Sequence, residues 1–221
     1  MDDVGASTKI YEQYSKYPFC NLFFLKRIKK LKAWGIYQEM TLNHWEKVFD
    51  LLVEHNAVLN VAITATWVEY SGKLIPFNEK FPKQANFLKK ILKTKNINIL
   101  NHGLTHCITE KKKFRPRLIQ SNRKYHREFY DWVPYEKQLN NLKQSKKILE
   151  NYFETEIDTL VPPGNVYSDA TIEIANNLGF KYLNCNTNSN SNKNINILGN
   201  KNVFAFHDKE IMELGLNWFS N

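Results

Sequence analysis

Short apolar segments typical of β-strands alternate along this chain with amphipathic segments typical of helices. Apolar runs and period-2 patterns indicate strands, whereas apolar residues spaced by three or four positions indicate helices. Repeated alternation of this kind implies a parallel sheet or barrel with helices packed against it. We expect strands over 57–68, 96–100, 158–161, 180–183 and 203–206, and helices beginning at Thr41, Pro82, Pro134 and Ser168.

The composition is that of one globular domain. The chain has 221 residues, of which 43% are hydrophobic and 14% aromatic, which suffices for one core but not for two comfortable ones. We therefore predict a single domain over 1–221. As written, the sequence shows no apolar run of membrane-spanning length and no N-terminal leader, so a soluble, cytoplasmic protein is expected. The three cysteines are widely separated and imply no disulfide framework.

The net charge of +9 could attract nucleic acid, anionic lipid or an acidic polymer. The lysines are scattered along the chain, as on an ordinary solvated surface, and no nucleic-acid partner is expected. Residues 19–34 combine apolar and basic side chains. This segment has two interpretations, a helix on an anionic membrane surface or a core-facing helix with a lysine-covered outer face. The second is the simpler one, and the first would make the protein membrane-peripheral.

Two histidines, His102 and His106, follow directly after the predicted strand 96–100. At this spacing both imidazoles can converge on one point, whether the segment forms a helical turn or a tight loop. Neutral imidazole is the commonest ligand of zinc-like metals, and a catalytic site needs about three protein ligands and one open position. Gly103 between them suits a turn. The pair alone is a weak motif, so a third ligand must come from elsewhere.

Other candidate residues also follow predicted strands. Pro162-Pro163-Gly164 comes after strand 158–161, and His207 comes after strand 203–206. The carboxyl ends of parallel strands form the edge where α/β barrels build their sites. At the start of the chain, Asp2 and Asp3 offer the oxygen ligand and the base that a metal-dependent hydrolase needs.

The periodic pattern stops over 108–133, a segment long enough to be either functional or disordered. Its many aromatic residues argue against disorder. We predict that it covers the site, with aromatic faces stacking on sugar rings and polar groups binding hydroxyls. The candidate substrate-binding residues are Asn122, Arg123, His126, Arg127 and Trp132. The low-complexity stretch 186–202 is predicted to be a surface loop.

Taken in order, these motifs resemble those of the polysaccharide deacetylase family, the NodB-homology carbohydrate esterases, in a divergent form. Asp2-Asp3-Val4-Gly5 resembles the first motif, in which the first Asp is the base and the second binds metal. Residues 102–106 resemble the His-Ser/Thr-x-x-His motif that completes the metal triad. Residues 161–164 resemble the Arg-x-Pro turn, and His207 corresponds to the histidine of the fifth motif, a general acid.

The resemblance implies an α/β fold, a distorted and incomplete (β/α) barrel whose first strand is truncated. It implies one divalent ion, expected to be zinc, and a hydrolase that removes an N-acetyl or similar N-acyl group from an amino sugar of a polysaccharide or glycoconjugate. Two alternatives stay open, a deacylase of a lipid-linked sugar at the membrane and a catalytically impaired binder of glycans or polyanions. The implied roles are metal ligand for Asp3, His102 and His106, base for Asp2, acid for His207, and oxyanion turn for Pro163 and Gly164.

The chain departs from the family pattern in four places, and at one of them Gly5 follows Val4 and not the second Asp directly. Val161 stands where the family usually has the Arg that orients the base, and Arg123 or Arg127 could replace it. Near 181–184 no Asp is available to support the acid histidine, so the substitutes would be Asn184, Asn186 or Asp208. The sequence begins inside the first motif, which implies either a start further upstream or a barrel that closes differently.

Overall fold

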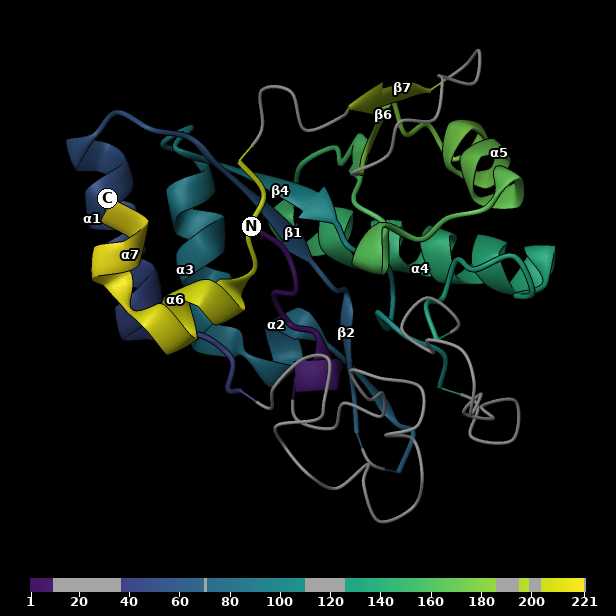
Figure 1. Ribbon diagram of the computed structural model, residues 1–221, viewed down its shortest axis with the longest axis horizontal. Coiled ribbons are helices and arrows are strands. Elements are labelled where there is room, and N and C mark those ends of the chain that lie inside the picture. The colour runs from purple at the N-terminus through teal and green to yellow at the C-terminus, as the bar shows by residue number, and fades with distance from the viewer. Residues whose placement is uncertain (10–36, 70, 110–125, 186–194, 199–203, 221) are drawn as a thin grey trace.

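The computed structural model describes residues 1–9, 37–69, 71–109, 126–185, 195–198 and 204–220, and its centre is a five-stranded sheet (Figure 1). All neighbouring strands are parallel and run in the order β1-β4-β5-β6-β7. Sheets of this kind have both faces covered, and most residues of β1 and β4 are accordingly buried. The strands are β1 (Leu59–Ile63), β4 (Ile97–Asn101), β5 (Thr159–Leu160), β6 (Tyr182–Asn184) and β7 (Asn196–Leu198).

The N-terminal segment extends this sheet beyond β1. Val4 forms a parallel bridge with Ile63, and Asp2 forms one with His207. The backbone N–H of Thr64 donates to Val4 O at 2.9 Å, and that of Asp2 donates to Phe206 O at 3.0 Å. The first strand is therefore reduced to two bridges that join β1 to the chain before α6 (Asp208–Leu214). The predicted α/β fold with a parallel sheet is confirmed, and the strands of the described residues do not close into a complete barrel.

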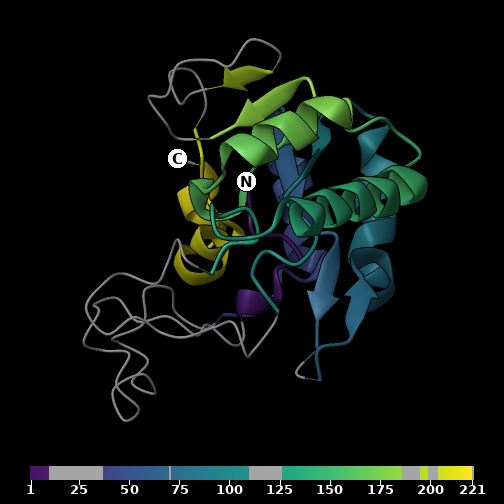
Figure 2. The same ribbon diagram turned by 90° about the vertical axis from the view of Figure 1, so that its right-hand side faces the viewer.

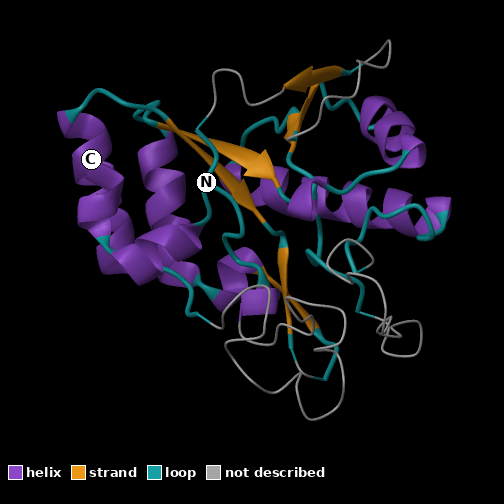
Figure 3. Ribbon diagram, in the orientation of Figure 1, coloured by secondary structure: helices purple, strands orange, loops and turns teal. Residues whose placement is uncertain are grey.

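Helices pack on both sides of the strands, as the colouring by secondary structure shows (Figure 3). α1, α3 and α7 form one group, in which α1 contacts both of the others, and α4 packs against α5 on the other side. Figure 2 shows α4 and α5 in front of the strands. The bounds are α1 (Leu42–Glu54), α2 (Phe77–Lys80), α3 (Pro82–Leu92), α4 (Tyr135–Phe153), α5 (Asp169–Asn177) and α7 (Leu216–Ser220), with short 3₁₀ turns at Ser7–Lys9 and Pro163–Asn165.

The helix starts follow local capping chemistry. The side chain of Thr41 accepts from the backbone N–H of His44, and that of Ser168 accepts from Thr171. Both residues satisfy backbone donors that have no partner within the helix. The four predicted helix starts are confirmed. The apolar stripe of α1, with Trp45, Val48 and Leu52, is buried in the core beneath the sheet.

The predicted strand 57–68 is wrong in one respect, because it breaks after Ile63. The following residues, β2 (Thr66–Val68), form an antiparallel hairpin with β3 (Leu74–Pro76) instead of continuing the sheet. At the break, the backbone N–H groups of Ala65 and Thr66 donate to Gly103 O and Leu104 O at 3.0 and 2.9 Å. The loop formed by residues 102–106, the histidine loop, therefore accepts the backbone hydrogen bonds that these residues would have donated within a longer strand.

Two predictions at the C-terminal end also need correction. Residues 204–206 belong to no strand, and Phe204 is 78% exposed. The predicted surface loop 186–202 contains β7 and the buried Ile195, because a short apolar run is hidden among its polar residues. Segment 19–34, Asn122, Arg123 and Asn186 lie outside the described residues. In the described part of the chain, no helix has the length and apolar character needed to cross a membrane.

Candidate metal centre and active site

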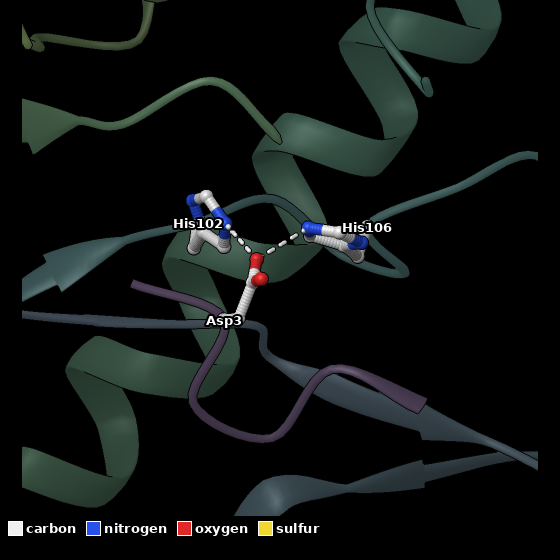
Figure 4. A group of neighbouring side chains, drawn as sticks. All are labelled: Asp3, His102 and His106. Carbon is white, nitrogen blue, oxygen red and sulfur yellow. Dashed lines mark hydrogen bonds and ion pairs between the residues drawn. The ribbon is translucent and has the colours of Figure 1, made fainter. Parts of the chain in front are cut away.

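Three side chains from two distant parts of the chain converge on one point (Figure 4). The Oδ1 atom of Asp3 lies 3.2 Å from Nε2 of His102 and 2.8 Å from Nε2 of His106. All three residues are buried, with 4%, 0% and 1% of their surface exposed. One carboxylate and two imidazoles form the three-ligand set of a catalytic zinc-type site. The predicted metal triad is therefore assembled by the fold.

Backbone geometry places each of these groups. His102 follows the last residue of β4, and its N–H donates to Ile63 O at 2.9 Å. Asp3 and His106 both have left-handed backbone angles, with φ of 65° each. Such angles are uncommon for residues other than glycine and are maintained only where the surroundings impose them. The fold therefore bends the chain at both ligands so that their side chains turn toward His102.

The tautomer of His102 is set by a backbone carbonyl. Its Nδ1 lies 2.7 Å from Val161 O. A carbonyl oxygen only accepts, so Nδ1 carries the proton and Nε2 faces Asp3. Burial opposes the charged imidazole, but the hydrogen bond to Asp3 and the nearby Asp2 raise the pKa of His102 above its ordinary value. Val161, which lacks the family's arginine side chain, still supplies the carbonyl that orients this ligand.

His106 is held from several sides. Its Nδ1 lies 2.9 Å from both Thr8 Oγ1 and Arg127 Nη1. Burial, reinforced by the Arg127 charge, lowers the pKa of His106 to about 3, which keeps the ring neutral. Since Arg127 can only donate, Nδ1 accepts here and Nε2 carries the proton that faces Asp3. If Nε2 held a metal, Nδ1 would carry the proton; the Thr8 hydroxyl could accept it, whereas Arg127 Nη1 would have to move away.

The charge on Asp3 suits a metal ligand. Burial would favour its neutral form, but His106 and His102 hold the pKa of Asp3 well below its ordinary value. The ligand atoms of the triad lie within 4.8 Å of one another. An ionised carboxylate beside a neutral imidazole is the form in which these groups bind divalent cations. The residues present therefore fit the ion that the family resemblance implies.

Asp2 and His207 lie beside the triad, with His207 Nε2 3.4 Å from Asp2 Oδ1. Asp2, Asp3 and His207 form a second cluster of converging groups that shares Asp3 with the metal triad. Burial and the neighbouring Asp3 charge raise the pKa of Asp2 above its ordinary value. The predicted base and acid thus stand next to the predicted metal position and next to each other.

A carboxylate that the sequence pattern did not predict for this site, Glu210, lies beside the Nδ1 nitrogen of His207. Oε2 of Glu210 lies 3.5 Å from His207 Nδ1 and accepts the His207 backbone N–H at 2.8 Å. Asp208, one of the predicted substitutes, instead binds Lys9 and the Tyr37 hydroxyl. A histidine followed three positions later by Glu at a helix start is a capping-box pattern, which could have revealed Glu210.

The Pro-Pro-Gly turn lies against Arg127. Gly164 has φ of 63°, and a Cβ atom added there would lie 2.7 Å from Arg127 Nε. The turn is joined to the end of β4 because Val161 N–H donates to Asn101 O at 2.8 Å. Arg127 therefore lies between the predicted oxyanion turn and His106. The Arg127 guanidinium contacts the ring of His106, a predicted metal ligand, and the prediction that Arg123 or Arg127 replaces the arginine that orients the base stays a prediction.

The remaining substrate-binding predictions have different outcomes. His126 is only 2% exposed, and burial together with Arg127 lowers its pKa to about 3, so it offers a sugar no surface in this conformation. Trp132 is half-buried and lines a cavity of about 470 Å³ between the histidine loop and α4. Thr105 and Asn141 line the same cavity. Trp132 therefore remains a candidate for contact with a glycan.

Residues 34–183 match the family model described as polysaccharide deacetylase. This range contains His102, His106 and the Pro-Pro-Gly turn, but neither the Asp2-Asp3 pair nor His207. Those residues are linked to the matched range by the geometry described above. A search among curated proteins finds no match for this chain.

Several solved structures are similar to the chain at low sequence identity. A CE4 family pseudoenzyme from Bacillus anthracis is 14% identical with a TM-score of 0.44, over 68% of this chain and 39% of its own. The BpsB deacetylase domain from Bordetella bronchiseptica is 16% identical with a TM-score of 0.48, over 65% and 59%. A de-N-acetylase from Aggregatibacter actinomycetemcomitans is 13% identical with a TM-score of 0.45, over 72% and 67%. This chain thus spans well under half the length of the first of them.

Proposed function

Because the chain belongs to the polysaccharide deacetylase family, we propose that it removes an N-acetyl or similar N-acyl group from an amino sugar of a glycan, with the help of one divalent metal ion. The observation that carries this proposal is the convergence of Asp3, His102 and His106 at one buried point. Asp3 lies about a hundred positions before the two histidines in the sequence, and together the three residues supply the donor types that a hydrolytic zinc site uses.

Asp3, His102 and His106 would hold the ion, which we propose to be zinc because two imidazoles and a carboxylate are one of the ligand sets of catalytic zinc sites. When bound, such an ion polarises the acyl oxygen and lowers the pKa of a water molecule. The chain's own residues do the remaining work. They must bind the sugar, accept the proton of the attacking water and return a proton to the leaving nitrogen.

Asp2 is the proposed base, since it is a carboxylate beside the metal position and its side chain is 24% exposed. His207 is the proposed acid, because an amine leaves readily only when its nitrogen is protonated and imidazole can supply that proton. The Gly164 N–H in the Pro-Pro-Gly turn is a candidate donor to the acyl oxygen, with Arg127 next to it. Trp132 would contact a neighbouring part of the glycan.

The test is acetate release from N-acetylated oligosaccharides by protein that is metal-loaded, chelated, or reconstituted with zinc. We expect release by the loaded protein, loss after chelation and recovery with zinc. His106→Ala should abolish release, whereas the matched variant His55→Ala, at the exposed end of α1, should not. Acetate release by protein shown to be metal-free by elemental analysis would refute the metal-dependent scheme. A metal-loaded protein that binds glycans but releases no acetate would support the impaired-binder alternative instead.

A further inference from the structure

A buried carboxylate lies against the histidine loop, residues 102–106. Glu128 is 1% exposed and comes from the segment that precedes α4, more than twenty positions after the second histidine of the motif. Burying a carboxylate costs several kcal/mol unless hydrogen bonds compensate. Its position and its partners therefore call for an explanation that the family motifs do not provide.

The Glu128 carboxylate accepts hydrogen bonds from three consecutive backbone N–H groups. These belong to Leu104 at 3.2 Å, Thr105 at 3.3 Å and His106 at 2.9 Å. Successive N–H groups that point to one place form a concave site for an anion. Here the anion is a side chain of the same protein, and the hydrogen bonds run to the backbone of the loop that carries both histidines.

The turn also fits closely around this carboxylate. A Cβ atom added to Gly103 would lie 2.0 Å from Glu128 Oε1, so only glycine leaves room for it. Gly103 and His106 both have left-handed backbone angles, with φ of 80° and 65°. The hydrogen bonds to Glu128 thus compensate for a loop conformation that the chain would otherwise avoid.

Further contacts attach the carboxylate to the rest of the fold. Asn141 of α4 donates from Nδ2 to Glu128 Oε2 at 3.0 Å. Arg127, the preceding residue, places Nη1 2.9 Å from Nδ1 of His106. Two adjacent residues therefore hold His106, one through its backbone and the other through its ring.

We propose that Glu128 is the positioning residue of the metal centre, whose carboxylate shapes the 103–106 turn so that His106 Nε2 faces Asp3 and His102. This inference rests on the proposed function only in that the triad binds a divalent ion. It assigns the described residues after 125 a role in building the site; the predicted covering role of 108–133 stays a prediction, because 110–125 lie outside the described residues.

The decisive variant is Glu128→Gln, which keeps the shape of the side chain. Oε1 serves His106, and Oε2 serves Leu104 and Asn141. Gln offers one oxygen and one NH₂ group, so at least one of these donors would face another donor. Removing the support of a metal ligand typically costs about 10- to 100-fold in metal affinity. We expect Co²⁺ affinity, measured by chelator competition on the full chain, to fall by about this factor.

Two readouts separate positioning from a general loss of stability. The visible absorption of bound Co²⁺ reports ligand geometry and should change in Glu128→Gln, while circular dichroism of the variant stays native. Glu136→Gln, an exposed change in the first turn of α4, should match the wild type in both. Wild-type Co²⁺ affinity and spectrum in a folded Glu128→Gln would overturn the inference, even if its melting temperature were lower.

If Glu128→Gln does not fold, Asn141→Ala gives the answer, because it removes one donor to the carboxylate without a new buried charge. We then expect a several-fold weaker affinity for Co²⁺, and an unchanged affinity would overturn the inference. The proposed function is tested separately. Wild-type protein that binds Co²⁺ but releases no acetate from N-acetylated glycans would refute the deacetylase proposal and leave the role of Glu128 intact.

Discussion

The two halves of the candidate site differ in how far they are removed from solvent. The proposed metal triad is almost fully buried, with at most 6% of any side chain exposed, whereas the Asp2 and His207 side chains are 24% and 28% exposed. A ligand set must be rigid and largely dry to hold an ion in one geometry. A base and an acid must reach a water molecule and a leaving group. The difference in burial is therefore the one expected for the roles that we propose for these residues.

The two halves are also anchored differently. The triad is held by groups from several segments, among them the Val161 carbonyl and the Thr8 hydroxyl. The acid–base half depends on the pairing of Asp2 with the chain at His207, and beneath it lies a buried ion cluster. In that cluster the Lys9 ammonium binds Asp208 and also lies 2.5 Å from Glu39 Oε2. Burial opposes the charge of Lys9, yet the two carboxylates raise its pKa above the ordinary value.

The largest effect should come from removing the carboxylate of the triad. Asp3→Asn keeps the size of the side chain but replaces the ionised ligand, so metal content should fall to background and acetate release by at least about 10³-fold. Elemental analysis and an acetate assay measure both quantities. Asp50→Asn, on the exposed face of α1, is the control. An Asp3→Asn protein that retains full metal content would show that the triad is not the metal site.

His207→Ala should separate the two halves. Because His207 belongs to the acid–base half, we expect metal content to be unchanged while turnover falls by about 10²- to 10⁴-fold, the usual contribution of a positioned acid. Parallel metal and rate measurements on one preparation test this. Loss of metal in this variant would mean that the two halves are a single coordination site.

Lys9→Met should lower the free energy of unfolding, because it disrupts the buried ion cluster that lies beneath Asp2 and His207. It leaves the Asp208 and Glu39 carboxylates buried without their shared cation, which typically costs about 3 to 5 kcal/mol. Equilibrium unfolding in urea measures the free energy of unfolding of each variant. The matched control is Lys89→Met, which breaks a 2.7 Å pair with the largely exposed Glu154 and should cost less than about 1 kcal/mol. Equal costs for the two changes would contradict the structural role of the cluster.

The buried histidines next to Arg127 should make the metal-free protein sensitive to acid. The folded pKa values of His106 and His126 are about 3, below the ordinary value of 6.5. Their contribution to stability is therefore present above pH 6.5 and is lost as pH falls through 6.5 toward 3. In that range the histidines are protonated in the unfolded chain but stay neutral in the folded protein. The free energy of unfolding, measured at several pH values, should fall less steeply with decreasing pH in His126→Gln than in the wild type. The two slopes should differ by about 1.4 kcal/mol per pH unit, the effect of one proton. A slope identical to that of the wild type would show that His126 is protonated in the folded protein.

The smallest effect is expected for Glu210→Gln. Glu210 lies 3.5 Å from His207 Nδ1, and both side chains are 28% exposed. Partly exposed ion pairs contribute about 0.2 to 1 kcal/mol, so turnover should fall by no more than about fivefold with metal content unchanged. A loss as large as that of His207→Ala would mean that Glu210 takes part in the proton transfer itself.

Much of this site could be predicted from local patterns. A histidine pair four residues apart after a strand, a Pro-Pro-Gly turn and a late histidine are all visible in the sequence, and the fold brings them to one edge of the sheet. Glu128 could not be found this way, because its partners are backbone N–H groups that leave no trace in side-chain identity. The end of β1 at Ile63 could not be predicted either, for a similar reason. The backbone N–H groups of the residues that follow donate to carbonyl groups of the histidine loop, a contact that side-chain identity does not reveal.

By itself, the sequence determined the alternation of strands and helices, the capped helix starts and the types of ligand available, because each depends on neighbouring residues. Only the tertiary structure decided that Asp3 lies against His102 and His106, and that Asp2 pairs with His207 across the whole length of the chain. It also decided which carboxylates are buried and which meet solvent. Those outcomes depend on packing between distant segments, and burial and charge there set the protonation states on which the chemistry rests.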